Sequence, residues 1–145
     1  MKLVIQRVKH AKVHIDNKVH SQINQGLLIF VCLEKGDKAE TLKKAVDKVL
    51  KLRIFEDENG KMNKNIIDIN GSILSVSQFT LSWDGKKGNR PSFENAMPPK
   101  EAQLNYSLFN KFLSESVTIE TGKFGADMDI EAVNNGPVTF HLDFN

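Results

Sequence analysis

The chain is poor in residue types that mark whole classes of protein. Its 145 residues include one cysteine, Cys32, so no disulfide can form within the chain, which suits a reducing compartment. No apolar run reaches the ~18 residues of a membrane helix. Charged residues follow Met1 too closely for a signal peptide. We therefore expect a cytoplasmic protein that has no membrane partner.

The excess of positive over negative charge is also small. The formal net charge is +2, which is too mild for a protein that grips a long duplex but permits contact with a short piece of nucleic acid. Cys32 lies inside the apolar run 27–33. Because no neighbour in the sequence would lower its pKa, we interpret it as a buried strand residue rather than a catalytic thiol.

The usual side-chain signatures of catalysis are missing. The four histidines, His10, His14, His20 and His141, form no metal-spaced pair. The sequence has no phosphate loop, dinucleotide fingerprint or nucleophile elbow. We therefore expect neither a metal nor a cofactor.

Apolar periodicity predicts mostly β-structure in the first third. Alternation over 2–9 and 13–15 predicts strands, and Asp16-Asn17 predicts the tip of a hairpin. The continuous apolar run 27–33 is typical of a central strand covered on both faces.

Two segments have helical periodicity instead. Asp37 is the expected N-cap of the first helix, with Glu40 three residues on as in a capping box. Pro98-Pro99 opens the second helix. Each helix has one apolar stripe, formed by Leu42, Ala45, Val46, Val49 and Leu50 in the first and by Ala102, Tyr106, Phe109 and Leu113 in the second.

The remaining patterns complete an α+β fold. Asn59-Gly60 and Asn70-Gly71 predict tight turns, and 82–99 predicts a long loop. Short strands are expected at 53–55, 72–77, 117–120, 128–133 and 138–144. Strands come in runs without strict βαβ alternation. We therefore expect a single domain over 1–145, an antiparallel β-barrel or sheet with two flanking helices.

Two stretches carry unusual chemistry. Ser77-Gln78-Phe79-Thr80-Leu81 closes a predicted strand with two hydroxyls, an amide and an aromatic ring. Thr80 or Ser77 would act as a nucleophile if a base lay nearby; alternatively, backbone N–H groups of the turn would hold an oxyanion. The second stretch, Asn-Asn-Gly-Pro-Val-Thr at 134–139, is a turn before a strand.

Together these stretches resemble the two signature motifs of the D-aminoacyl-tRNA deacylases. Further segments resemble the family in the same order along the chain: Val4–Val8, Gly60–Asn63, Lys87–Phe93 and Phe124–Met128. The resemblance covers essentially the whole chain. It implies a homodimer of small β-barrels that hydrolyses the ester joining a D-amino acid, or mischarged glycine, to the 3′-terminal adenosine of tRNA.

The resemblance also implies roles for individual residues. A Gly-cis-Pro pair inserted from the partner subunit rejects L-amino acids, and here it is Gly136-Pro137, supported by Arg7. Ser77, Gln78, Phe79 and Thr80 are the candidate catalytic residues, and Met128 is expected to contact the pocket. The loop cations Lys86, Lys87 and Arg90 are candidate contacts to tRNA phosphates.

Three alternatives stay open at this point. In the first alternative, the chain is a non-catalytic RNA-binding barrel, although one Trp and one Tyr are few for stacking on bases. It is an editing module of an aminoacyl-tRNA synthetase. Or it is a hydrolase of another ester that uses Thr80 as a true nucleophile.

Overall fold

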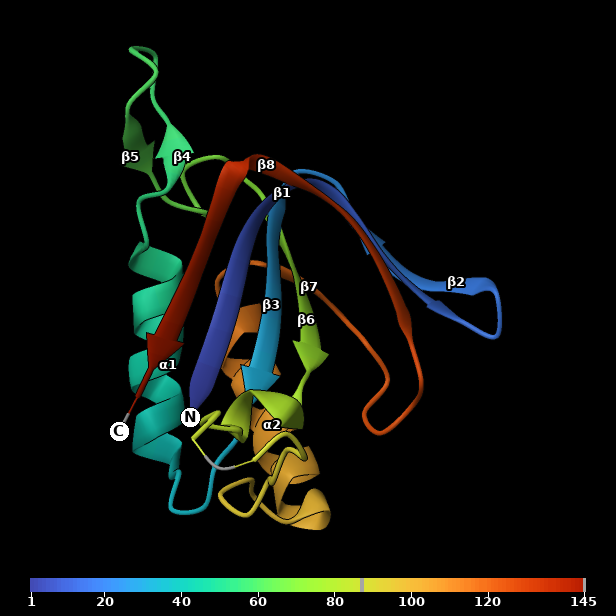
Figure 1. The fold of residues 1–145 in the computed structure, drawn as a ribbon. Helices are drawn as coiled ribbons and strands as arrows, with labels where there is room; N and C mark the ends of the chain where they lie inside the picture. Colours follow the sequence, from blue (N-terminus) through green and yellow to red (C-terminus); the bar gives the residue numbers. More distant parts are fainter. Residues whose placement is uncertain (87, 145) are drawn as a thin grey trace.

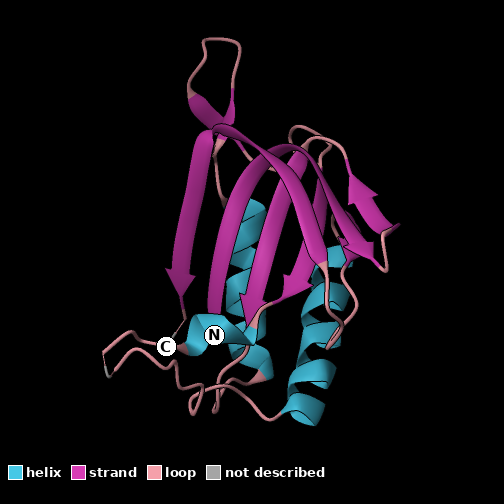
Figure 2. Cartoon of the chain, turned by 45° about the vertical axis from the view of Figure 1, so that its right-hand side comes forward, coloured by secondary structure: helices cyan, strands magenta, loops and turns pink. Residues whose placement is uncertain are grey.

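The computed structural model describes residues 1–86 and 88–144 and is built on a curled sheet backed by two helices (Figures 1 and 2). Its elements, in chain order, are β1 (Lys2–Ile15), β2 (Lys18–Ile23), β3 (Gly26–Cys32), α1 (Ala39–Lys51), β4 (Phe55–Glu56), β5 (Met62–Lys64), β6 (Ser72–Ser77), the 3-10 helix η1 (Phe79–Ser82), α2 (Pro99–Ser114), β7 (Thr118–Thr121) and β8 (Asp129–Asp143).

The main sheet is mixed, so the expectation of an antiparallel sheet was wrong. The strand order is β2-β1-β3-β6-β7, and β8 pairs with β1. β1 is antiparallel to β2, β3 and β8, but β3–β6 and β6–β7 are parallel. Parallel neighbours need long crossover connections, and the segments containing α1 and α2 are those crossovers.

The N-terminal hairpin matches its prediction closely. Asp16 and Asn17 both have positive φ, 51° and 59°, which is the backbone of a two-residue turn that follows the twist of the strands. β1 is one strand of 14 residues, longer than the two short strands expected at 2–9 and 13–15. It stays continuous because β8 pairs with it over most of its length.

The C-terminal strand is also longer than expected. The segments 128–133 and 138–144 are not separate strands but parts of β8, which passes through Gly136-Pro137. The register against β1 shifts on both sides of Val8. Pairing therefore resumes after a local bulge, which a sequence pattern interrupted by Gly-Pro does not reveal.

Both helices bury the stripes that their periodicity predicts, since the stripe residues of each helix are buried or half-buried. The expected N-cap was wrong. Asp37 does not cap α1, because its carboxylate accepts hydrogen bonds from the Met1 ammonium (2.9 Å) and the Glu34 N–H (2.7 Å). The helix begins at Ala39 instead, where the Thr41 hydroxyl accepts the N–H of Lys38.

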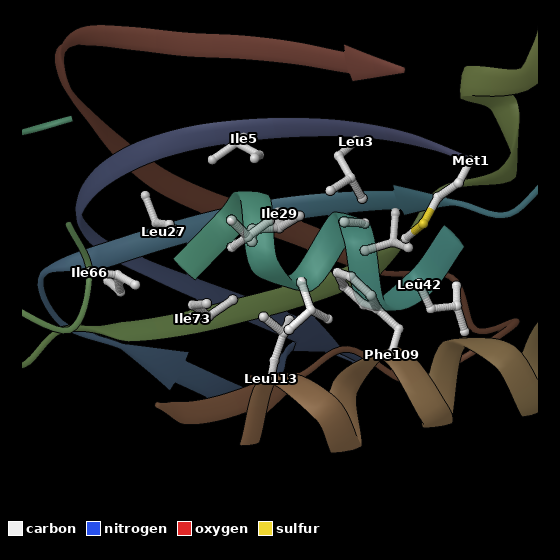
Figure 3. Close-up of a cluster of buried hydrophobic side chains, with 14 of the residues drawn as sticks. Met1, Leu3, Ile5, Leu27, Ile29, Leu42, Ile66, Ile73, Phe109 and Leu113 are labelled. Carbon is white, nitrogen blue, oxygen red and sulfur yellow. The ribbon is translucent and has the colours of Figure 1, made fainter. Parts of the chain in front are cut away.

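The larger core lies between the sheet and the two helices. Figure 3 shows Leu3, Ile5, Ile29 and Ile73 of the sheet facing Leu42 of α1 and Phe109 of α2. A smaller core, which includes Val8, Ala11, Val13, Leu28, Leu74 and Val76, fills the other face, where the sheet curls over itself. Across residues 1–86 and 88–144, none of the helices has the length and hydropathy to span a membrane.

Candidate active site

The stretch Ser77–Thr80 lies where β6 ends and η1 begins. Ser77, Gln78 and Phe79 line a pocket of about 610 Å³, a size that suits a small ligand. Thr80, although predicted to be catalytic, is not among the described lining residues. The rest of the lining comes from β3, the loop before α2, the start of α2, and the loop before β8. These include Val31, Phe93, Met97, Ala102, Tyr106, Phe124 and Met128. The structure thus brings Met128 together with the predicted catalytic stretch.

The backbone around Gln78 is held in place from the neighbouring strand. The N–H of Gln78 donates to the carbonyl of Val31 at 2.7 Å, and the thiol of Cys32 donates to the carbonyl of Phe79 at 3.5 Å. Phe79 is 56% exposed and meets Phe93 edge to face, with ring centroids 5.0 Å apart. The first N–H groups of a helix have no partner within it, so the N–H groups of Phe79 and Thr80 at the start of η1 are candidates to hold an oxyanion.

Among the described residues, no histidine or carboxylate is hydrogen-bonded to Thr80. Its hydroxyl accepts a hydrogen bond from the Gln78 side-chain amide (2.7 Å), and an amide N–H cannot take a proton from it. Among the described residues that line the pocket there is no histidine, lysine or arginine, and the single carboxylate is that of Asp127. This arrangement favours backbone stabilisation of an oxyanion over a hydroxyl nucleophile.

Replacing Thr80 with alanine is expected to lower kcat/KM by about fivefold or less, because an exposed hydrogen bond contributes about 1 kcal/mol. Single-turnover hydrolysis by the purified variant measures this, with Ser77→Ala as the matched test of the other hydroxyl. A loss on the order of a thousandfold at Thr80 alone would instead identify it as the nucleophile.

Cys32 is fully buried beneath the same turn. Burial, and next the charge of Glu34, raises the pKa of the Cys32 thiol to about 11. A thiol with so high a pKa is not a nucleophile near neutral pH, which agrees with its interpretation as a buried strand residue.

The raised pKa predicts a specific alkaline instability. The unfolded thiol ionises near pH 9.0 and the folded one near 11, so stability is lost as the pH rises through this window. We expect wild type to lose about 1 kcal/mol more free energy of unfolding than Cys32→Ala between pH 8 and 10. Urea denaturation at both pH values measures this difference, and parallel losses in the two proteins would contradict it.

Gly136 and Pro137 lie outside the pocket, at the opposite end of the sheet. Their peptide bond is cis, as the resemblance implied. The flanking residue Asn134 pairs with Val8 of β1, and Val8 pairs with Gly26 of β3. Gly26 pairs in turn with Ser72, so Asn134 lies level with the start of β6. Ser77 lies at the far end of β6, about 16 Å further along at ~3.3 Å per residue.

The buried Arg7 side chain holds the Gly136 segment through a hydrogen bond to the neighbouring Asn135 carbonyl. The side chain is only 4% exposed; Nε donates to the Asn135 carbonyl at 2.9 Å, and Nη1 donates to the Ile54 carbonyl at 2.6 Å. Nη2 lies 3.8 Å from the Glu56 carboxylate. Arg7 and Gly136-Pro137 therefore form one unit, as expected, but this unit does not meet Ser77–Thr80 within one chain.

The predicted loop cations are only partly placed. Lys86 and Arg90 are exposed in the loop between η1 and α2. The Lys86 ammonium lies 3.9 Å from Asp84, so part of its charge is offset. Lys87 lies outside the described residues. Their contact with tRNA stays a prediction.

Tyr106 is a pocket residue that sequence reasoning assigned to the core alone. Its hydroxyl donates to the Ser75 carbonyl at 2.7 Å, and burial raises its pKa. Its position on the apolar stripe of α2 predicts only burial. The tertiary structure shows that it also lines the pocket, together with residues of the loop before α2. Within the described parts of the chain, no group of three or more histidine, cysteine or acidic residues is placed to hold a metal ion.

Comparisons with known proteins identify the family. The model of the family described as D-Tyr-tRNA(Tyr) deacylase matches residues 4–143. A D-aminoacyl-tRNA deacylase of Lactobacillus delbrueckii subsp. bulgaricus is 54% identical over 99% of both chains.

Solved structures agree in fold. One titled c-Myc DNA Unwinding Element Binding Protein has a TM-score of 0.95 at 40% identity and covers 99% of this chain and 98% of its own. One described as a probable eukaryotic D-amino acid tRNA deacylase has a TM-score of 0.82 at 17% identity, over 97% of both chains. With a family model that spans nearly its whole length and a relative more than half identical, this chain belongs to the D-Tyr-tRNA(Tyr) deacylase family.

Proposed function

We propose that the chain hydrolyses the ester bond of D-aminoacyl-tRNA as a cytoplasmic homodimer, and that each subunit supplies Gly136-Pro137 to the pocket of its partner. Family membership makes the chain an ester hydrolase of the D-aminoacyl-tRNA deacylase type. The proposal concerns how its residues would perform that reaction and select the substrate.

The observation that carries the proposal is the described lining of the pocket, which has no histidine and only one carboxylate, that of Asp127. Water attacks the ester carbonyl, and the N–H groups at the start of η1 stabilise the negative charge that develops on the carbonyl oxygen. The C–O bond to the ribose then breaks, and the ribose oxygen takes up a proton as the amino acid leaves. Because the aminoacyl ester is intrinsically labile, positioning and the substrate's own 2′-OH supply the rest.

Selection between D and L substrates is proposed to work by exclusion. The two share every functional group, and many side chains must be accepted, so attraction to the side chain cannot discriminate. A wall where an L side chain would point rejects it. Gly136 keeps the backbone close to the substrate, and the proline ring fixes φ. Glycine, which has no side chain to clash, is expected to be accepted.

A second subunit is needed because the two parts of the site lie at opposite ends of one chain's sheet. Gly136-Pro137 is exposed, next to the start of β6, whereas the pocket lies at the end of β6. A twofold-related partner can bring its exposed Gly136-Pro137 to the pocket, since a symmetric interface makes the same contact twice.

The test is hydrolysis of matched D-tyrosyl-tRNA and L-tyrosyl-tRNA by the purified protein. Fast loss of the D ester with the L ester spared supports the proposal. Loss of both esters would contradict rejection by a wall. Loss of neither, with uncharged tRNA still bound, would favour a binding protein, a function that the name of the relative known as a DNA unwinding element binding protein also suggests.

A further inference from the structure

The β4–β5 hairpin projects from the body at the end of the sheet where β8 bends beside β1 (Figures 1 and 2). Arg7 joins the two: it donates to the Ile54 carbonyl at the base of the hairpin and to the Asn135 carbonyl next to Gly136. Because Arg7 is buried and bonded to both, the hairpin and the Gly136 segment form one unit. Whatever surface Gly136-Pro137 meets, the hairpin lies beside it.

The hairpin is held by polar side chains rather than by a core of its own. The Asp57 carboxylate accepts the N–H groups of Asn59 (2.9 Å) and Lys61 (3.0 Å) and the side-chain amide of Asn63 (2.9 Å). These hydrogen bonds lower the pKa of Asp57. Arg53 donates to the Asn63 carbonyl at 2.7 Å. A hairpin this short is marginal alone, so these bonds fix its shape.

Among the described residues, the tip presents one cation that makes no ion pair, Lys61. The ammonium of Lys64 pairs with Glu58. The carboxylate oxygens of Asp57 accept the hydrogen bonds that shape the turn. The Lys61 side chain is exposed and makes no ion pair within residues 1–86 and 88–144. The neighbouring Met62 side chain is 51% exposed. The hairpin therefore presents a fixed backbone, a free ammonium and an apolar side chain to solvent.

The pocket itself supplies no cation for a phosphate. No lysine or arginine is found among its described lining residues, and Asp127 carries a negative charge there. The 3′ end of tRNA has one phosphate per nucleotide, and such groups are usually met by lysine, arginine or backbone N–H groups. Any lysine or arginine that meets a phosphate next to the terminal adenosine therefore lies outside this lining, either in the loop of Lys86 and Arg90 or elsewhere in the dimer.

We propose that the β4–β5 hairpin of one subunit contacts the 3′ strand of the tRNA held in its partner's pocket, with Lys61 on a backbone phosphate. This inference rests on the insertion of Gly136-Pro137 into the partner's pocket in the proposed function. Lys61 is a substrate-binding residue in it and takes no part in ester cleavage.

The first test compares Lys61→Glu with wild type on D-tyrosyl-tRNA and on D-tyrosyl-adenosine, which has no phosphate. The expected result is a KM for the tRNA raised about tenfold with kcat unchanged, and no change on the adenosine ester. For Lys61→Ala, the slope of log kcat/KM against log salt concentration should fall by about one. Lys18→Glu is the matched control, because Lys18 is an exposed lysine at another hairpin, β1–β2, far from the β4–β5 hairpin (Figure 1).

Mixed dimers test the contact between subunits. One subunit is inactivated by Ala102→Trp, which fills its pocket, and Lys61→Glu is placed either in that subunit or in the active one. The KM should rise only when Lys61→Glu is in the inactive subunit, since its hairpin serves the active pocket. A KM that rises only when Lys61→Glu is in the active subunit, opposite the subunit that carries Ala102→Trp, would overturn the inference.

The two proposals fail in different ways. Wild type that cleaves neither ester, or cleaves both equally, contradicts the proposed function, and the hairpin inference falls with it. Wild type that is selective, with an unchanged KM in Lys61→Glu or an equal change in Lys18→Glu, overturns the hairpin inference alone.

Discussion

Replacing Arg7 with lysine is expected to lower the ratio of D- to L-tyrosyl-tRNA hydrolysis at least tenfold, roughly 1.4 kcal/mol of discrimination. The guanidinium donates from two nitrogens to the carbonyls of Asn135 and Ile54, and an ammonium cannot reproduce this fork. One buried carbonyl then loses its partner, at a cost of about 1–3 kcal/mol. The Gly136 segment is then held less firmly, and the wall that we propose against L side chains is expected to move.

The change is measured as separate kcat/KM values for the two esters, together with the thermal unfolding midpoint. Arg53→Lys is the matched control, because Arg53 makes a similar fork but is exposed and directs it to Asn63 rather than to the Gly136 segment. A folded Arg7→Lys protein that keeps the wild-type D/L ratio would show that Arg7 does not maintain selectivity.

Gly136→Ala is the complementary change in the same unit. Gly136 has φ +136°, which L side chains rarely adopt, and a Cβ there would lie 2.7 Å from Val138 Cγ2 and 3.1 Å from Arg7 Nη2. The segment must shift to accept it. We expect the D/L ratio to fall as in Arg7→Lys, although the arginine itself is intact.

Gly26→Ala is expected to prevent folding, or to lower the free energy of unfolding by more than about 3 kcal/mol. A Cβ at Gly26 would lie 1.8 Å from the Ser72 carbonyl oxygen and 2.8 Å from its carbon. Both groups are backbone and belong to the first pair of the parallel β3–β6 ladder. No rotamer can relieve the overlap, so the strands must separate, and the pocket at the far end of β6 is lost with them.

Far-ultraviolet circular dichroism and urea denaturation measure the effect. Gly36→Ala is the control, because a Cβ there meets nothing within 4 Å and only its φ of +92° opposes the change, at about 1–2 kcal/mol. A folded Gly26→Ala protein no less stable than Gly36→Ala would mean that β3 and β6 do not approach so closely.

Local patterns were sufficient to predict most elements. The Asp16-Asn17 turn, the buried strand over β3 and the apolar stripes of α1 and α2 all follow from periodicity and turn chemistry. These features depend on residues a few positions apart, so the sequence is enough to specify them. The same is true of the Ser77–Thr80 stretch at the end of its strand, for which the resemblance to the family predicted a catalytic role.

Contacts between distant residues were decided only by the tertiary structure. The parallel pairing of β3 with β6 depends on how α1 crosses the sheet, and nothing near Gly26 signals the approach of Ser72. Asp37 has the sequence of an N-cap, but its carboxylate accepts hydrogen bonds from the Met1 ammonium and the Glu34 N–H instead. Tertiary contacts override a local preference where a distant group makes a better hydrogen bond to the same side chain.

The functional site divides in the same way. The sequence by itself was enough to name the candidate residues, Ser77–Thr80 in one motif and Gly136-Pro137 in the other, because each motif is a continuous stretch that resembles the family. Only the tertiary structure showed that these motifs lie at opposite ends of the sheet, with Arg7 joining Gly136 to the β4–β5 hairpin. The distance between motifs depends on strand pairing across more than a hundred residues of sequence, which no local pattern contains.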